Sequence, residues 1–528
     1  MFDLVVRGGD VLDGTGRPAW RADVAVVDGR IEAIGDLTGA SAAVELDATG
    51  AVVAPGFIDA HAHTDLSYFA VGDQPELRLA GLRQGVTTEV CGNCGWTPFP
   101  RTDAFGADVD RHIGAIFPDP VPLFESYGGF RAAAGKEPMA ANLVPLIGHG
   151  TIRAAAMGLA DRAPTADELR AMERLVAQAM EEGAFGLSSG LMYPPGVYSS
   201  AAEVTALATV AARYGGVYAT HMRDEADHVV ESVTETLRVG AAAGVAVQVS
   251  HHKVAGSRNW GRTAETLAAI ERARASGLDV TVDAYPYTAG STMLRALLPP
   301  WANDGGVEPL LQRLADPAAV RRMERDFAEG LPGWQNLAGM VGWSNVIVAS
   351  CEHEADEGRS IERLADEAGL SDVAFVADFL RREAARPVVV IHLMDEPDVQ
   401  AVLSRPYAMV GSDGILVRGK PHPRVAGTFA RVLGRYVVHE KLFDLPEAVR
   451  KMTSLPAARF RLPDRGVLAP GKAADVVVFD PARVLDGATY DEPLRPPTGV
   501  EFVLVAGLVV IERGRDTGAR PGAVLEPG

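Results

Sequence analysis

Residues 51–63 read AVVAPGFIDAHAH, an apolar run that ends in two histidines, His61 and His63. In a β-strand, residues i and i+2 point to the same face. Both imidazoles can therefore reach one metal ion from the end of a strand. An H-x-H pair alone is weak evidence, because two solvated loop histidines can have the same spacing. Its position after an apolar strand makes it informative and indicates where other candidate ligands should lie.

Seven further apolar segments end in polar clusters, and they are residues 86–94 (VTTEVCGNC), 142–150 (NLVPLIGHG), 184–190 (AFGLSSG), 216–225 (GVYATHMRDE), 245–253 (VAVQVSHHK), 279–287 (DVTVDAYPY) and 408–414 (AMVGSDG). Helical stretches with typical capping residues lie between them, at residues 165–182, 201–214, 227–243 and 262–276. Strands that alternate with helices form parallel sheets. Eight such units predict an α/β fold, a (β/α)8 TIM-like barrel, in which the chemistry lies at the C-terminal strand ends.

Both ends of the chain are rich in short β-type segments. They are residues 4–7, 22–27 and 30–34 at one end, and 474–479 and 500–510 at the other. Gly8-Gly9 is expected to end the first strand, and Asp28-Gly29 between apolar runs predicts a hairpin. Neither end alone has enough strands for a stable sheet. We therefore expect the two ends to form one small β-sandwich domain together.

The interval between the seventh and eighth barrel strands is too long for a single crossover. We expect an insertion at roughly residues 296–390, which either covers the barrel mouth as a lid or folds as a separate subdomain. The expected division is 1–54 and 465–528 for the two parts of the small β-domain, 55–415 for the barrel with its insertion, and 416–464 for a helical return.

Length and composition exclude several classes of protein. The chain has 528 residues, of which 47% are hydrophobic and 23% charged, and this suits a large soluble domain with a smaller one. A net charge of −19 repels phosphate backbones, so we expect no nucleic-acid partner. Three cysteines argue against a disulfide framework. No apolar run reaches the roughly 20 residues that cross a bilayer, and the acidic start MFDLVVRGGDVLDG is unlike a signal peptide. We expect a cytoplasmic protein without a membrane partner; the oligomeric state stays open.

Four more candidate ligands stand at the ends of other predicted strands, and they are Cys94, His221, His251 and Asp413. Neutral imidazole, thiolate and carboxylate are the ligand types of zinc. A catalytic zinc keeps one position open for a water molecule, whose pKa it lowers toward neutrality. A nearby carboxylate can accept the proton of that water and deliver it to a leaving nitrogen. The pattern predicts a catalytic zinc site at the barrel mouth.

Three other motifs have competing interpretations. Residues 186–190 (GLSSG) match a nucleophile elbow, but the elbow needs a helix directly after the serine, and MYPPG at 192–196 prevents one. Cys91-Gly-Asn-Cys94 matches a redox C-x-x-C, yet Gly-Asn favours a turn and no helix begins there. We therefore favour Cys94 as a metal ligand. In the pair His251-His252, neighbouring strand residues face opposite ways, so only one imidazole can enter the site.

Together the segments closely resemble the D-aminoacylases, the N-acyl-D-amino-acid deacylases of the amidohydrolase superfamily. GFIDAHAH and PGKAADVVVFD are typical of the superfamily, whereas GNCG, ATHMRDE and SHHK are typical of the deacylase branch. DAYPY-TAGSTML, MDEPDVQ and GSDG add to the resemblance, which extends to about Asp480. It implies a tight zinc site formed by Cys94, His221 and His251. It also implies a second, weaker metal position completed by His61, His63 and Asp413, with Asp413 as general base.

The resemblance further implies a set of substrate-binding residues. It assigns Lys253, Tyr285 and Arg295 to the substrate carboxylate, and Arg223 and Ser291 to the pocket rim. Two cations and a phenol near strand ends can hold a carboxylate through charge-assisted hydrogen bonds. A surface or salt-bridged position for Arg295 is the competing interpretation.

We expect zinc-dependent hydrolysis of N-acyl-D-amino acids to a carboxylate and a free D-amino acid. If the apolar residues 296–301 (ALLPPW) line the pocket rather than pack the insertion, apolar side chains are favoured. The first alternative is the opening of a cyclic imide or ureide. Those relatives usually bridge two metals through a carboxylated lysine after strand four, and SSGLMY contains none. The second is a non-catalytic scaffold, which should have lost ligands that this chain retains.

Overall fold

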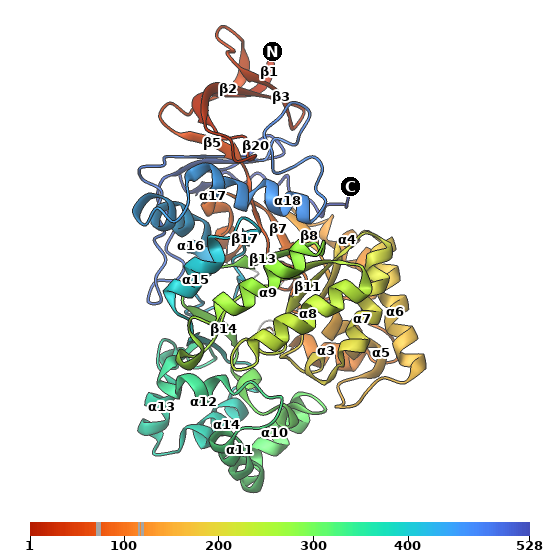
Figure 1. The fold of residues 1–528 in the computed structure, drawn as a ribbon. Coiled ribbons are helices and arrows are strands. Elements are labelled where there is room, and N and C mark those ends of the chain that lie inside the picture. Colours follow the sequence, from red (N-terminus) through yellow and green to blue (C-terminus); the bar gives the residue numbers. More distant parts are fainter. Residues whose placement is uncertain (70–74, 115–116, 118–120) are drawn as a thin grey trace.

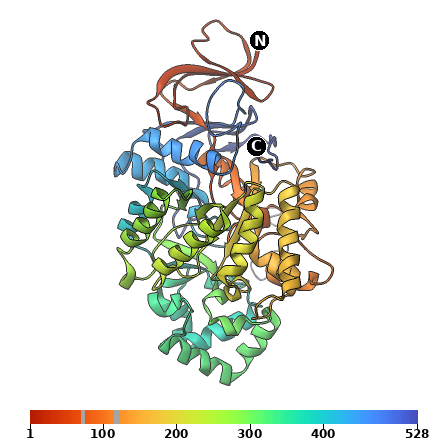
Figure 2. The ribbon, with the colours of Figure 1, turned by 45° about the vertical axis from the view of Figure 1, so that its right-hand side comes forward.

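The computed structural model of the chain describes residues 1–69, 75–114, 117 and 121–528. Figure 1 shows three parts in a row: a β-rich part near both termini, a central part of strands and surrounding helices, and a helical part at the far end. The turned view in Figure 2 keeps this order. Within the described ranges, no helix is long and apolar enough to cross a membrane.

The β-rich part is one sheet to which both ends of the chain contribute. Its described strands are β1 (Phe2–Val11), β2 (Trp20–Val27), β3 (Arg30–Gly35), β4 (Ala42–Asp47), β5 (Val52–Pro55), β18 (Val476–Phe479), β19 (Val500–Val505), β20 (Leu508–Glu512) and β21 (Arg515–Asp516). Antiparallel pairing of β18 with β5 joins the two ends. The expectation that Gly8-Gly9 ends the first strand is wrong. β1 continues to Val11, because Gly8 adopts a φ of +63° and the register against β2 shifts there, as in a β-bulge.

The central part contains the parallel strands. They are β6 (Phe57–Asp59), β7 (Val86–Cys91), β8 (Asn142–Pro145), β9 (Ile147–Gly148), β10 (Gly186–Gly190), β11 (Val217–His221), β12 (Ala246–Val249), β13 (Val280–Ala284) and β17 (Ala408–Val410). They pair in the orders β6-β7-β8 and β9-β10-β11-β12-β13-β17. The N–H of Ala60 donates to the carbonyl of Val410 at 3.2 Å, and Ala62 pairs in parallel with Gly414. The first and last parallel strands are therefore neighbours, and all their C-terminal ends lie on one side.

Helices cover the outside of these strands (Figure 1). The four predicted helical stretches are confirmed as α6 (Ala166–Glu181), α7 (Ala201–Arg213), α8 (Val229–Ala243) and α9 (Thr263–Ala275). A capping box begins α6, because Thr165 and Glu168 satisfy each other's backbone N–H groups. Shorter helices cover the first strands, and they are α1 (Thr64–Ser67), α2 (Pro75–Leu79), α3 (Gly106–Gly114), α4 (Tyr127–Ala134) and α5 (His149–Met157).

The helical part at the far end lies between β13 and β17 in the sequence. A small antiparallel sheet connects it to the central part, with strands β14 (Ala289–Met293), β16 (Val388–His392) and β15 (Val346–Ser350) in that order. Its helices are α10 (Val307–Ala315), α11 (Pro317–Glu329), α12 (Leu337–Val341), α13 (Ile361–Ala368) and α14 (Asp372–Arg382). Because β14 pairs with β16, the inserted unit begins at Ala289.

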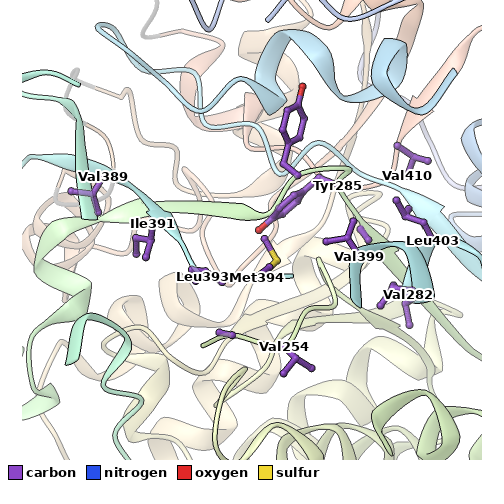
Figure 3. Close-up of a cluster of buried hydrophobic side chains, with 14 of the residues drawn as sticks. Val254, Val282, Tyr285, Val389, Ile391, Leu393, Met394, Val399, Leu403 and Val410 are labelled. Carbon is purple, nitrogen blue, oxygen red and sulfur yellow. The ribbon is translucent and has the colours of Figure 1, made fainter. Parts of the chain in front are cut away.

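The insertion and the central strands share a continuous apolar core. Figure 3 shows Tyr285, at the end of β13, with Leu393 and Met394 on one side and Val399 and Val410 on the other. These side chains belong to one buried cluster. The chain then runs through α15 (Glu396–Leu403) to β17 and returns toward the β-rich part through α16 (Arg424–Arg431), a π-helix (Val432–His439), α17 (Leu445–Met452) and α18 (Ser454–Arg459). The buried residues around the end of β13 therefore pack against both the insertion and the central strands.

Candidate metal and substrate site

The candidate ligands meet at the C-terminal ends of the parallel strands. His221 is the last residue of β11, while Cys94, His251 and Asp413 lie just beyond β7, β12 and β17. These last three residues have positive φ values of 53°, 33° and 52°. Such conformations cost on the order of 1–3 kcal/mol each in non-glycine residues and are concentrated at functional sites. The backbone at these three strand ends therefore adopts an energetically unfavourable left-handed conformation, and the three side chains point toward one another.

Cys94, His221 and His251 form the first group of possible ligands, with all three ligand atoms within 4.8 Å of one another. Cys94 Sγ lies 3.8 Å from Nδ1 of His221 and 3.5 Å from Nε2 of His251. The three residues are at most 5% exposed. One thiolate and two imidazoles fit zinc, and three protein ligands leave the fourth tetrahedral position for water or substrate.

A second group shares Cys94 with the first and adds His61, His63 and Asp413. Nε2 of His61 lies 3.5 Å from Cys94 Sγ and 3.5 Å from Asp413 Oδ1. Nε2 of His63 lies 3.2 Å from the same Asp413 oxygen. The sequence-predicted H-x-H pair therefore aims both imidazoles at one carboxylate, next to the first group.

The surroundings favour the ligand forms of the two first-group histidines. Burial lowers the pKa of His221 and of His251 well below the usual value, so both imidazoles are neutral at physiological pH. Burial also raises the pKa of the Cys94 thiol well above its usual value. A thiolate at this depth therefore needs a cation beside it, and a metal ion would supply that charge.

Asp413 is held by an arginine that sequence reasoning missed. Nη1 of Arg424, on α16, lies 2.9 Å from Asp413 Oδ2, and the guanidinium is only 1% exposed. Burial alone would raise the pKa of Asp413, but Arg424 and the neighbouring histidines together outweigh it and lower that pKa well below the usual value. Arg424 lies beyond the last parallel strand, after a turn and a loop. No periodicity in that part of the sequence predicts that its side chain reaches the site.

The cavity above the ligands contains three of the five predicted substrate-binding residues. Lys253, Tyr285 and Ser291 line it together with the ligand residues. Lys253 Nζ lies 5.8 Å from the centre of the Tyr285 ring, and Cζ of Arg424 lies 4.6 Å from it. The side chains of Lys253 and Arg424 therefore flank the Tyr285 ring, beside the candidate metal ligands.

Arg295 and Arg223 do not line this cavity. Arg295 is 5% exposed and donates through Nη1 to Asn303 Oδ1 at 3.2 Å. Arg223 pairs with Glu235 at 3.0 Å and donates to the carbonyls of Val197 and Ser199. Arg223 borders a separate depression that also contains Ala296, Leu298 and Pro300 from the apolar stretch 296–301.

Comparisons with known proteins identify the family of the chain. Residues 44–511 match the amidohydrolase family. The chain is 39% identical to the D-aminoacylase and 40% identical to the N-acyl-D-glutamate deacylase of Alcaligenes xylosoxydans xylosoxydans, over 99% of its own length and 97% and 96% of theirs. The chain belongs to the D-aminoacylase branch of the amidohydrolase family. A crystal structure of N-acyl-D-glutamate deacylase from Bordetella bronchiseptica superimposes with a TM-score of 0.83 at 38% identity, covering 99% of both chains. That protein was crystallised with zinc and a phosphonate that mimics the tetrahedral intermediate of the reaction.

The serine motif of this amidohydrolase has a structural explanation. Ser188, on β10, donates to the carbonyl of Gly92 and accepts from the N–H of Gly95 at 3.1 Å. These bonds fix the turn that carries Cys94. Cys91 is buried in a different, apolar cluster with Phe99 and Ile147. Of the histidine pair, His251 enters the metal cluster, whereas His252 contacts Thr266 on α9 through Nε2 at 2.8 Å.

Proposed function

We propose that this amidohydrolase hydrolyses the amide bond of N-acyl-D-amino acids with one zinc ion held by Cys94, His221 and His251. The observation that carries the proposal is the convergence of these ligands with Asp413 in a cavity that also presents Lys253. Zinc bound there would polarise the acyl carbonyl and lower the pKa of a water molecule. The relatives named above act on the same class of substrate and share nearly the whole chain.

Asp413 is the proposed general base. Its Oδ1 accepts a proton from the attacking water and returns it to the nitrogen of the leaving amino acid. Arg424 fixes Oδ2, so that Oδ1 points toward His61 and His63. These two histidines and Asp413 form a second, weaker metal position, and Cys94 touches both. We infer that this second position is not needed for turnover.

The substrate α-carboxylate lies beside Lys253 and Tyr285. Lys253 lines the cavity, and Arg424 is buried with its Nε without a hydrogen-bond partner. Arg295 and Arg223, which the sequence suggested for the carboxylate and the rim, do not line the cavity, so we assign this role to Lys253 and Tyr285, with Ser291 beside them and Arg424 behind the Tyr285 ring. Charge-assisted bonds of this kind supply orientation as well as energy.

The cavity favours an apolar D-side chain. Apart from the charged cluster, its lining includes Met192, Leu337, Ile391, Leu393 and Ile415. A side-chain carboxylate among these groups would be buried without a partner, which costs several kcal/mol. Hydrolysis of a cyclic imide or ureide is the alternative. It is disfavoured because β10 and the following turn, SSGLMY, contain no lysine to bridge two metals.

The fold proposed with this function is the complete barrel. We propose that β6, β7, β8 with β9, β10, β11, β12, β13 and β17 close as a (β/α)8 barrel, with the terminal sheet folded as a β-sandwich beside it. The contacts of Ala60 with Val410 and of Ala62 with Gly414 support closure. A barrel also accounts for all six candidate ligands at one mouth.

Steady-state kinetics on matched substrates test the proposal. We expect kcat/KM to be highest for N-acetyl-D-leucine, lower for N-acetyl-D-glutamate, and lowest for N-acetyl-L-leucine, with zinc present in all reactions. A preference for the D-glutamate substrate would contradict only the side-chain assignment. A preference for the L-leucine substrate, or for a hydantoin, would contradict the proposed reaction itself.

A further inference from the structure

Glu225 lies behind the proposed zinc ligands and has no role in the mechanism above. It is 5% exposed and follows His221 by four residues, in the segment after β11. Its Oε2 lies 3.7 Å from Nε2 of His221. Its Oε1 lies 3.1 Å from Nδ1 of His251 and 2.8 Å from Nζ of Lys253. One buried carboxylate is therefore within hydrogen-bond distance of His251 and of the substrate-binding lysine, while Nε2 of His221 lies farther away and has no hydrogen-bond partner.

The two histidines face Cys94 with different ring nitrogens. His221 presents Nδ1 and His251 presents Nε2. A neutral imidazole that gives one nitrogen to a metal carries its proton on the other nitrogen. The protonated nitrogens would then be Nε2 of His221 and Nδ1 of His251, and these are the two that face Glu225. Oε1 of Glu225 lies within hydrogen-bond distance of Nδ1 of His251, whereas Nε2 of His221 is too far from Oε2 to donate to it.

Lys253 makes this acceptor necessary. Its Nζ lies 2.6 Å from Nδ1 of His251. An ammonium group has only donors, so without an acceptor between them Lys253 would donate to Nδ1. The ring proton of His251 would then sit on Nε2, the nitrogen that faces Cys94. Oε1 of Glu225 is within hydrogen-bond distance of both groups and can accept from each.

We propose that Glu225 is a positioning residue that selects the metal-binding tautomer of His251 and keeps Lys253 from reversing it. This inference rests on the proposed zinc site at Cys94, His221 and His251. Outer carboxylate partners of metal-bound histidines typically change metal affinity by about 10–100-fold when they are removed. Glu225 also accepts from the competing donor Lys253, so its loss should fall in the upper part of that range.

The test measures zinc affinity of the full-length apoprotein by competition with a chromophoric chelator. Glu225→Gln keeps the size but offers only one acceptor oxygen, and Glu225→Ala offers none. We expect zinc affinity to fall about 10-fold or more in the first variant and further in the second. Asp227→Asn is the matched control, because Asp227 lies in the same segment and pairs with the exposed Arg258 at 2.8 Å. It should bind zinc like the unchanged protein.

A double variant separates tautomer selection from simple loss of charge. Lys253→Met removes the competing donor, so Glu225→Ala with Lys253→Met should recover part of the zinc affinity lost in Glu225→Ala alone. Cobalt-substituted protein supplies a second readout, since the visible spectrum of Co²⁺ should change in Glu225→Ala and return toward the original in the double variant. No recovery in either measurement would overturn the assignment.

Cys94→Ala distinguishes failure of this inference from failure of the proposed site. If Cys94→Ala binds zinc as tightly as the unchanged protein, the zinc site itself is wrong. If Cys94→Ala loses zinc but both Glu225 variants retain affinity within about twofold, well below the expected range, the site stands and the role of Glu225 is wrong.

Discussion

Two buried clusters of ionisable side chains lie at strand ends of this molecule, and they differ in how their polar atoms are satisfied. In one, His149 and Arg153 at the start of α5 both contact Glu203 on α7, with His149 Nε2 at 2.9 Å and Arg153 Nη1 at 2.7 Å from Oε1. In the other, Cys94, His221 and His251 face one another at 3.5–3.8 Å. The first cluster pairs donors with an acceptor, whereas the second brings lone-pair-bearing atoms together. The second arrangement is the one that a bound metal ion would complete.

This difference shows why burial and residue type alone do not identify a site. His149 ends an apolar segment in the sequence just as His221 and His251 do. Its partner Glu203 lies on a helix 54 residues later, so the ion pair is visible only in the fold. Glu203 satisfies Arg153 and His149 within the protein, and the trio connects α5 to α7.

The largest expected difference between the clusters is in metal content. Cys94→Ala removes the ligand that the two metal groups share, so zinc and activity should both be lost. The loss should exceed the roughly 10–100-fold typical of an outer partner of a ligand. Zinc per chain, measured by atomic emission after dialysis, and kcat/KM on N-acetyl-D-leucine are the measurements. Cys91→Ala, in the apolar cluster, is the control and should keep both; the reverse result would exchange the roles of the two cysteines.

A smaller effect than the loss of zinc is expected when the metal ligands stay in place but the general base, Asp413, is replaced. Asp413→Asn is isosteric and can still coordinate weakly, but its amide cannot accept the proton from water. We expect kcat to fall by about 10²–10⁴-fold, the usual contribution of a positioned acid–base residue. Zinc content should stay at the level of the unchanged protein. Turnover close to that level would remove Asp413 from the mechanism.

The sequence predicted the fold and the candidate site best where the relevant residues lie within one strand or helix. The H-x-H pair, the strand ends with Cys94, His221, His251 and Asp413, and the four long helices all follow from local periodicity and capping. Arg424 and Glu225 could not be assigned in this way. Arg424 reaches Asp413 from a helix beyond the last parallel strand, and Glu225 shares its segment with other charged residues. Arg295 has a suitable charge near a strand end and donates to Asn303 from its helical turn, and its contact with the substrate carboxylate stays a prediction.

The smallest effect on catalysis, and the sharpest test of the comparison, is expected from Glu203→Gln. This change leaves Arg153, which is fully buried, without its carboxylate. Breaking a buried ion pair from one side typically costs about 3–5 kcal/mol. The midpoint of urea unfolding should therefore shift to a lower concentration, while zinc content and kcat/KM of the folded enzyme stay unchanged, because none of the three residues lines the catalytic cavity.

Glu168→Gln is the matched control for that experiment. Glu168 pairs with Arg162 at 2.6 Å, but at the surface, where such pairs contribute about 0–1 kcal/mol. Glutamine can also complete the capping box with Thr165, so the unfolding midpoint should hardly change. If Glu203→Gln instead loses zinc at unchanged stability, the His149 cluster belongs to the catalytic site, and the distinction between paired and converging polar groups fails for this protein. If both variants unfold at the same urea concentration, the buried trio contributes no more than a surface pair, and the connection between α5 and α7 must depend on their apolar contacts.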